Sequence, residues 1–312
     1  MSKYLIITID TEGDNLWNWH QGDVINTENT IYLSRFQELA NKYGFKPVWL
    51  SNYEMLSDER FVKFVKDVEE KQQGELGMHL HAWSTPPSYE LKNEENGQPY
   101  LIEYPSDVME EKIVEMTRII VEKTGIRPVS HRSGRWATNR TYFRLLKKHG
   151  YLVDCSYTPH IDWSQYKGQS KGACGSNYSN VPENIMKLEE GMTEIPLTVI
   201  KSHHFFMPRK FCLKKIISNI YKSIKGQNLW LRPNGNNLDE MLYLLDKVKQ
   251  SDKNYIMFMI HSSELMPGGS PTFKNEEDIE KLYSDLEILF SKASKEYVGI
   301  TLRDYEKKLH KR

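Results

Sequence analysis

The sequence predicts an α/β fold in which a mostly parallel sheet closes, or nearly closes, into a barrel with helices outside it. Short β-rich runs alternate with longer amphipathic stretches along the chain. Seven or eight such units follow one another, which favours a barrel over an open sheet. Polar residues also recur where the hydrophobic runs end, and in a barrel the carboxyl ends of the strands meet at one mouth.

Runs rich in β-branched and aromatic residues predict the strands. In chain order they are 4–10, 47–52, 75–81, 127–132, 151–157, 193–200, 254–261 and 297–302. Between them, apolar residues at helical spacing with charge on the opposite face predict helices. These helices are 29–43, 58–73, 107–124, 138–149, 237–250 and 275–295, with a further basic helix around 209–224.

We expect residues 1–312 to form a single domain with two loop excursions. Residues 83–105 are rich in Pro, Asn and Glu and predict a loop over one face of the barrel. Residues 158–192 carry many Gly, Ser, Asn and Tyr residues with little periodicity, which again indicates a loop.

The charge balance and hydropathy limit the partners and the compartment. The 312 residues include 42 Lys and Arg against 42 Asp and Glu, so net attraction to nucleic acid or to an anionic membrane is not indicated, although a local patch remains possible. The apolar run at 5–9 is too short, and too soon followed by acidic residues, for a signal peptide. No stretch approaches the length of a transmembrane segment, and we expect a cytoplasmic protein.

His79 and His81 stand at the end of the third predicted strand. Because they are two residues apart in an extended segment, both imidazoles project to the same side. Two imidazoles and a carboxylate suit zinc or a similar cation and leave positions for water or substrate. The string His-X-His is also common, so an ordinary pair of histidines at a strand end is the alternative.

Asp10 and Glu12 place two carboxylates at the end of the first strand. One can bind the cation while the other acts as a base on its water, because coordination lowers the pKa of that water. A solvated acidic loop is the alternative, since Asp14 follows closely.

Three further polar residues lie at or near later strand ends. Arg132 can orient a catalytic carboxylate and keep it ionised, or form a surface salt bridge. His261 follows five apolar residues and is either a buried core group or a catalytic acid. Asp154 lies late in the fifth run. Five strand ends with complementary chemistry favour one active-site mouth.

Five motifs in order resemble the polysaccharide deacetylase superfamily, also called the NodB-homology or carbohydrate esterase family 4 group. They are TIDTEGD (8–14), ELGMHLHAW (75–83), SHRSGRW (130–136), VDCSYTP (153–159) and MIHSSEL (259–265). The resemblance covers nearly the whole chain and is strongest to the divergent branch associated with lipopolysaccharide and capsule biosynthesis. It implies a distorted (β/α)7 barrel.

The resemblance also implies a role for each residue. Glu12, His79 and His81 would hold one divalent cation, for which zinc is the default by ligand type. Asp10 would be the base, steadied by Arg132, and His261 would protonate the departing amine. Asp154 would orient Arg132 or His261, and Trp83 and Trp136 would line the pocket.

The chain departs from the family pattern in two motifs. Thr11 separates two acids that are usually adjacent aspartates, and Glu12 takes the second position. The two histidines, usually four residues apart, are two apart, and Trp83 occupies the fourth place.

The expected activity is removal of an N-acyl group, acetyl by default, from an amino sugar of a cell-surface glycan or its precursor. No nucleic-acid partner is expected. A carbohydrate-binding protein that kept the barrel and lost the chemistry is one alternative. A metal hydrolase of a non-sugar amide or ester is the other.

Overall fold

The computed structural model describes residues 2–310 except 21, 93, 96 and 208–212. The main sheet consists of β1 (Lys3–Thr11), β2 (Pro47–Ser51), β3 (Glu75–Leu80), β4 (Ser130–Ser133), β5 (Val153–Asp154), β6 (Met186–Lys187), β7 (Thr193–Glu194), β10 (Tyr255–His261) and β11 (Tyr297–Gly299). The strand order is β10-β1-β2-β3-β4-β5-β7-β6, and β11 also pairs with β1. Every pairing from β10 to β7 is parallel, and β6 is antiparallel to β7. The curled sheet confirms the predicted distorted (β/α)7 barrel.

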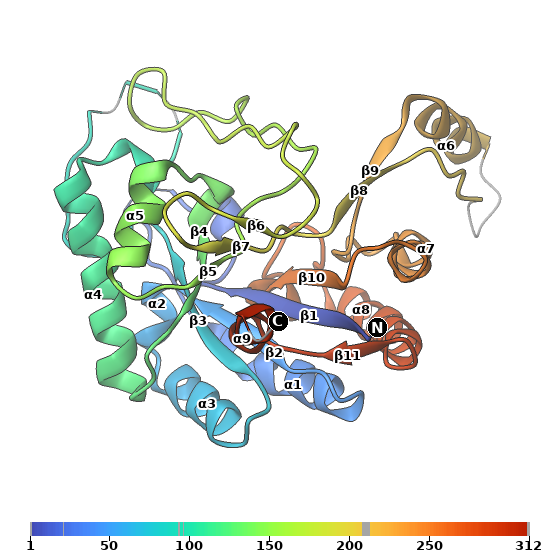
Figure 1. Cartoon of the computed structure of the whole chain (residues 1–312), viewed down its shortest axis with the longest axis horizontal. Coiled ribbons are helices and arrows are strands. Elements are labelled where there is room, and N and C mark those ends of the chain that lie inside the picture. Colours follow the sequence, from blue (N-terminus) through green and yellow to red (C-terminus); the bar gives the residue numbers. More distant parts are fainter. Residues whose placement is uncertain (1, 21, 93, 96, 208–212, 311–312) are drawn as a thin grey trace.

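Helices lie around the outside of this sheet (Figure 1). They are α1 (Leu33–Lys42), α2 (Tyr53–Leu56), α3 (Glu59–Glu70), α4 (Ser106–Thr124), α5 (Arg140–Lys148), α7 (Leu238–Lys249) and α8 (Glu276–Ala293). The last helix, α9 (Leu302–His310), contributes Leu302 and Tyr305 to the barrel interior, where they pack with Tyr4 and Tyr255. Of the helices that the structure describes, none combines the length and apolarity needed to cross a bilayer.

Alternation along the strands separates two apolar cores. In β1, Leu5 and Ile7 face the helices, whereas Tyr4 and Ile6 face the barrel interior. The same alternation holds in β10, because successive side chains of a strand point to opposite faces. The position of a residue in this alternation therefore determines whether its side chain faces the barrel interior or the helices.

The predicted strand 193–200 is wrong as a single element. It divides into β7 and β8 (Val199–Ser202), because Pro196 has no backbone N–H for a continuous ladder. The predicted strands 127–132 and 151–157 are also longer than the observed β4 and β5.

An arm projects from the barrel (Figure 1). We use this name for β8, α6 (Leu213–Lys225) and β9 (Gln227–Trp230), in which β8 and β9 form a separate antiparallel sheet. Helix α6 corresponds to the basic helix expected around 209–224, of which positions 209–212 lie outside the described residues.

Candidate active site

The candidate site lies at the carboxyl ends of four strands, on the face of the sheet that lines the barrel interior. Asp10 and Glu12 follow Ile6 and Thr8 on the interior face of β1, while Thr11 faces the helices. In β3 the apolar Met78 and Leu80 pack against the helices, so His79 and His81 point inward. The two-residue spacing in both motifs therefore places all four side chains in the same space.

Glu12, His79 and His81 form a buried cluster suited to a cation. Nε2 of His79 lies 3.0 Å from Nε2 of His81, and an oxygen of Glu12 lies 3.5 and 3.3 Å from these two nitrogens. In a tetrahedral zinc site, ligand distances of about 2.0–2.2 Å separate the ligand atoms by about 3.3–3.6 Å. Three electron-pair donors at nearly this separation, buried together, fit a divalent cation.

The orientation of both histidines agrees with this fit. Nδ1 of His79 donates to the backbone carbonyl of Arg132 at 3.0 Å, which leaves the lone pair on Nε2. Gly134 makes room for His81, because a Cβ at this position would lie 2.4 Å from Cδ2 of the ring. Nδ1 of His81 is buried with no hydrogen-bond partner among the described residues.

Arg132 and Asp10 form a fully buried ion pair beside this cluster. Nη1 of Arg132 donates to Oδ1 of Asp10 at 2.5 Å, and Nη2 donates to Oγ1 of Thr8 at 2.9 Å. Burial alone would raise the pKa of Asp10, but Arg132, assisted by His79, outweighs it, and the pKa lies below its usual value. Asp10 is therefore ionised, with Oδ2 left to face the site.

His261 faces the two acidic residues from β10. Its Nε2 lies 3.9 Å from Oδ2 of Asp10 and 3.9 Å from Oε1 of Glu12. Its ring packs nearly perpendicular to that of Trp17, which is partly exposed, with ring centroids 5.0 Å apart and an interplanar angle of 77°. His261 is thus at the boundary between the buried cluster and the opening.

Two residues that orient His261 were missed from the sequence. Glu264, in the turn after β10, accepts from the backbone N–H of His261 and has an oxygen 3.0 Å from its Nδ1. Burial would raise the pKa of Glu264, but Arg232 and the bond to His261 lower it to about 2. Nη2 of Arg232 lies 3.3 Å from Oε1 of Glu264. Glu264 and Arg232, whose Nη2 lies 3.1 Å from the same Nδ1, therefore hold the ring of His261 in place.

Asp154 does not have the partners expected of it. It is paired in register with His131, and its Oδ2 lies 2.5 Å from Nδ1 of that residue. His131 precedes Arg132 on β4 and therefore points to the helix side, where its Nε2 meets Tyr142 of α5. Orienting Arg132 or His261 is thus the wrong role for Asp154, because Asp154 lies on the opposite face of the sheet.

The two predicted tryptophans contact different residues of the site. Trp83 packs against His81, with ring centroids 4.4 Å apart. Trp136 lies over the guanidinium of Arg132 at 5.2 Å and stacks on Trp163. Trp136 and its neighbour Arg135 both have positive φ angles, 62° and 55°, which bulky residues seldom adopt.

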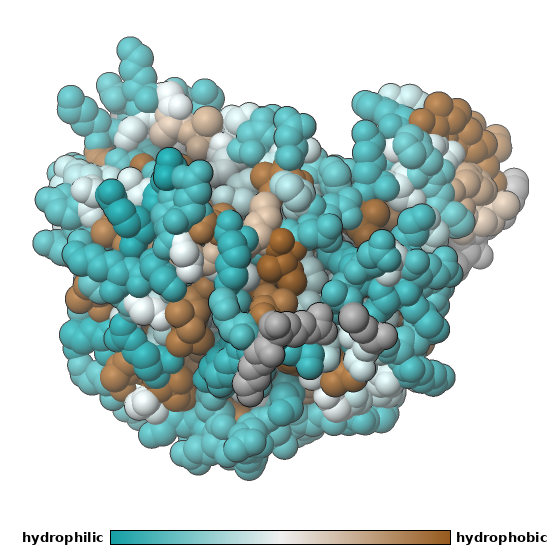
Figure 2. Space-filling model, in the orientation of Figure 1, coloured by the Kyte–Doolittle hydropathy of each residue, from teal (hydrophilic) through white to brown (hydrophobic). Residues whose placement is uncertain are grey.

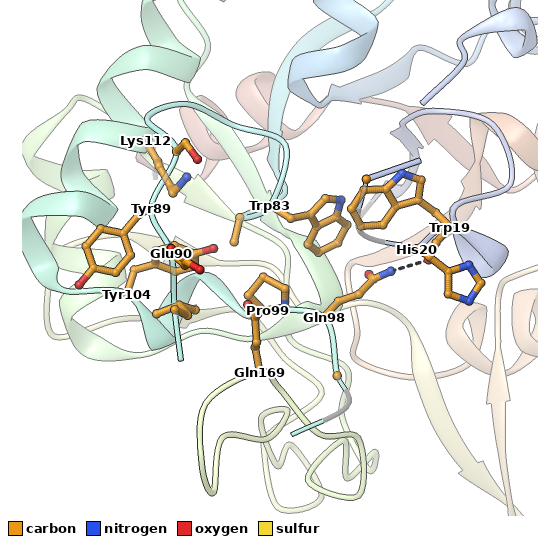
Figure 3. A pocket seen from close by; sticks show the side chains of 15 residues that line it. Trp19, His20, Trp83, Tyr89, Glu90, Gln98, Pro99, Tyr104, Lys112 and Gln169 are labelled. Carbon is orange, nitrogen blue, oxygen red and sulfur yellow. Dashed lines mark hydrogen bonds between the residues drawn. The ribbon is translucent and has the colours of Figure 1, made fainter. Parts of the chain in front are cut away.

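A cavity of about 700 Å³ opens beside Trp83 (Figure 3). Trp19 and Trp83 stack at one end, with ring centroids 5.9 Å apart, and Tyr89 and Tyr104 lie at the other. Polar groups, among them Gln98, line the wall between these aromatic pairs. The cavity size is typical of a small-molecule site.

The two long loops predicted from the sequence meet at this cavity. The N–H of Gly97 donates to the carbonyl of Gly168 at 3.1 Å. Glu103 accepts from the backbone N–H groups of Gln169 and Ser170. These bonds fix one rim of the cavity.

Comparison with known proteins found similarity in fold and none in sequence families. No protein-family model matches the sequence, and no curated protein matches it. A solved protein from Mycobacterium smegmatis, described as a candidate polysaccharide deacetylase, aligns with 99% of this chain and 91% of its own at TM-score 0.51 and 11% identity.

Two glycoside hydrolase family 57 branching enzymes also align. The one from Pyrococcus horikoshii covers 99% of this chain and 71% of its own, at TM-score 0.56 and 10% identity. The one from Thermococcus kodakaraensis covers 98% and 71%, at TM-score 0.54 and 10% identity. At these identities the chain shares the deacetylase-like barrel fold with these proteins, and its chemistry must be argued from its own site.

Proposed function

We propose that this protein is a metal-dependent hydrolase that removes an N-acyl group, acetyl by default, from an amino sugar of a cell-surface glycan or its precursor. One observation carries the proposal: the buried Glu12–His79–His81 cluster lies beside an ionised Asp10 and faces His261. We treat residues 1–312 as one catalytic unit.

Glu12, His79 and His81 would hold the cation, with zinc as the expected metal. When bound, the cation would supply Lewis acidity, lowering the pKa of a water and polarising the acyl carbonyl. The carbonyl of Arg132 holds the His79 ring in the required orientation.

Asp10 and His261 would move the protons. Arg132 occupies Oδ1 of Asp10, so Oδ2 is the atom that accepts a proton from the attacking water. As the C–O bond forms and the C–N bond breaks, Nε2 of His261 would give its proton to the departing amine. Glu264, at Nδ1, stabilises the protonated ring during this exchange.

The neighbouring cavity supports a sugar as the substrate. Stacked aromatic faces with polar groups between them suit pyranose rings, which have apolar faces and hydroxyl edges. The barrel shared with a candidate deacetylase from Mycobacterium smegmatis agrees with this substrate class.

Branching enzymes of glycoside hydrolase family 57 share this barrel fold, so carboxylate-based glycoside chemistry is the other activity to consider. That chemistry uses two carboxyl groups, one as acid and one as base or nucleophile. Here two histidines face Glu12, and an arginine occupies one oxygen of Asp10. The donor set therefore favours metal-assisted hydrolysis.

The test combines metal analysis with hydrolysis of a panel of N-acetyl and N-formyl amino sugars, free, nucleotide-linked, lipid-linked and polymeric. We expect one equivalent of metal in the purified protein and release of acyl product from at least one sugar. His79→Ala should lose both the metal and the activity, whereas the control His149→Ala, at a partly exposed ion pair with Glu110, should retain both.

Each alternative has its own outcome. Binding of a glycan without metal after supplementation, and without hydrolysis, would support the carbohydrate-binding protein. Metal-dependent hydrolysis of non-sugar amides or esters, with no hydrolysis of any sugar, would support the alternative of a metal hydrolase with a non-sugar substrate. Full hydrolysis by both Asp10→Asn and His79→Ala would rule out the mechanism.

A further inference from the structure

Helix α6 presents an apolar stripe to solvent. Leu213, Ile217 and Ile224 are 62%, 59% and 75% exposed, and Ile220 and Tyr221 are exposed beside them. Their spacing places them on one face of the helix. No side chain of α6 is buried, and Figure 2 shows this apolar surface at the outer end of the arm.

The opposite face attaches α6 to the protein. The side chain of Asn219 donates to the carbonyl of Phe206 at 2.7 Å, and the carbonyl of Ser223 lies 3.0 Å from Nδ1 of His203. His204 and Phe206 in turn pack on Tyr243 of α7. Because the helix is anchored through its polar side, the apolar stripe is directed away from the barrel.

The charges of α6 are all of one sign. The helix contains four lysines, Lys214, Lys215, Lys222 and Lys225, and no acidic residue. The chain as a whole has no net charge, so this helix is a local concentration of positive charge. An exposed apolar stripe flanked by lysines is typical of helices that lie in the interface of an anionic bilayer.

We propose that α6 docks the protein on a lipid bilayer that contains anionic lipids. Its apolar stripe enters the acyl boundary while the lysines contact phosphate headgroups. A second copy of this chain is the less favoured occupant, because two such helices would bring eight lysines together without an acidic partner on either helix. Duplex nucleic acid would match the lysines and leave the apolar stripe in water.

The residues that join the arm to the barrel place α6 close in sequence to the active site. Strand β9 ends at Trp230, and two residues later Arg232 contacts Glu264 and His261. Trp230 also contacts Trp163, which stacks on the Trp136 that covers Arg132. The bilayer-binding helix and the catalytic residues are therefore linked by one short segment.

Vesicle co-sedimentation of the full chain tests the proposal, with phosphatidylcholine vesicles that contain or lack phosphatidylglycerol. We expect binding to the anionic vesicles, and weaker binding as the salt concentration rises. Ile217→Glu/Ile224→Glu should weaken binding about tenfold or more. Lys214→Gln/Lys215→Gln should weaken it about fivefold per lysine. These two lysines are chosen because Lys222 has Glu240 nearby.

Control variants carry the same types of substitution at exposed positions elsewhere. Ile288→Glu on α8 and Lys63→Gln/Lys66→Gln on α3 should bind as the unchanged protein does. Circular dichroism and the melting temperature establish that each variant is folded. If the isoleucine variant fails to fold, the lysine variant, which keeps the apolar stripe, tests vesicle binding alone.

Three results would overturn the proposal. They are absence of vesicle binding, equal loss of binding in the control variants, and a dimer in light scattering that Ile217→Glu/Ile224→Glu dissociates while vesicle binding is lacking. Tighter binding to duplex DNA than to anionic vesicles would assign α6 to nucleic acid instead. Hydrolysis of a soluble sugar is measured separately, so docking can fail while the proposed function holds.

Discussion

Asp10 and His261 are directly paired positions of the parallel strands β1 and β10, and their side chains face each other with Oδ2 3.9 Å from Nε2. Arg132 takes the other oxygen of Asp10, and Glu264 takes the other nitrogen of His261. In each residue, one atom is therefore occupied by a partner, and the other atom, Oδ2 of Asp10 or Nε2 of His261, faces the site. Under the proposed function, this arrangement makes Asp10 the base and His261 the acid.

Asp10→Asn should reduce hydrolysis by about a hundredfold to ten-thousandfold, because the amide cannot take the proton of the water. The metal content should not change. The free energy of unfolding should fall by about 3 kcal/mol, since Arg132 loses the charge of its buried partner. Kinetics and urea unfolding measure the two effects. Asp67→Asn, at an exposed ion pair of α3, is the control and should alter neither.

Gly134→Ala should displace His81 and weaken metal binding by about tenfold or more. Gly44→Ala is the matched control. Gly44 has a φ of +72°, and a Cβ added there would meet no atom within 4 Å, so its substitution should cost stability without affecting metal affinity. Competition with a chelator measures the affinity, and equal values for the two variants would contradict the role of Gly134.

Glu264→Gln should reduce kcat by about tenfold or more with little change in KM, because His261 loses the charge that stabilises its protonated form. The Gln side chain keeps the size of Glu and can still accept from the backbone N–H of His261. Steady-state kinetics with the best sugar substrate measures this effect. A rise in KM alone would mean that Glu264 shapes the substrate site instead.

Asp58 should make stability depend on acidic pH. It caps α3, and although burial would raise its pKa, bonds from Arg60 and Thr27 lower it to about 2 from 3.8. A depressed carboxyl pKa contributes stability that is complete above about pH 4 and is lost as the pH falls towards 2. Asp58→Asn preserves a capping oxygen and lacks the charge. The unfolding free energies of the two proteins should therefore approach each other as the pH falls from about 4 and converge only below about pH 2, and a constant difference would contradict this account.

Trp19→Ala should raise KM for a soluble sugar by about tenfold while kcat changes little, because Trp19 lies in the cavity and is one ring removed from His81. Tyr221→Ala, which removes an exposed aromatic ring on α6, is the control and should leave KM unchanged. A fall in kcat alone would place Trp19 in the chemical step rather than in binding.

The sequence predicted the fold class and the convergence of the main polar residues, because period-two alternation in long strands is visible without a structure. In β1 and β3 the spacing of Asp10 with Glu12 and of His79 with His81 already places each pair on one face. Asp154 lies in a two-residue strand, which offers no alternation from which its face can be predicted.

Three supporting residues depend on contacts that periodicity does not describe. Glu264 meets His261 through a turn of 3-10 helix after β10. Arg232 reaches the same place from the end of the arm, 29 positions before His261. Gly134 matters through the close approach of a histidine ring from another strand. A glutamate three residues after a strand-end histidine is the one signal that could have been noticed, as a capping pattern.

The alternation that builds the site also makes it intolerant of length changes. A one-residue deletion within β1 would exchange the faces of its side chains beyond that point, turning both carboxylates towards the helices and bringing Thr11 inward. An insertion within β3 would do the same to both histidines. Such a site can be altered by substitution one residue at a time, whereas a slip in either strand removes its ligands in pairs.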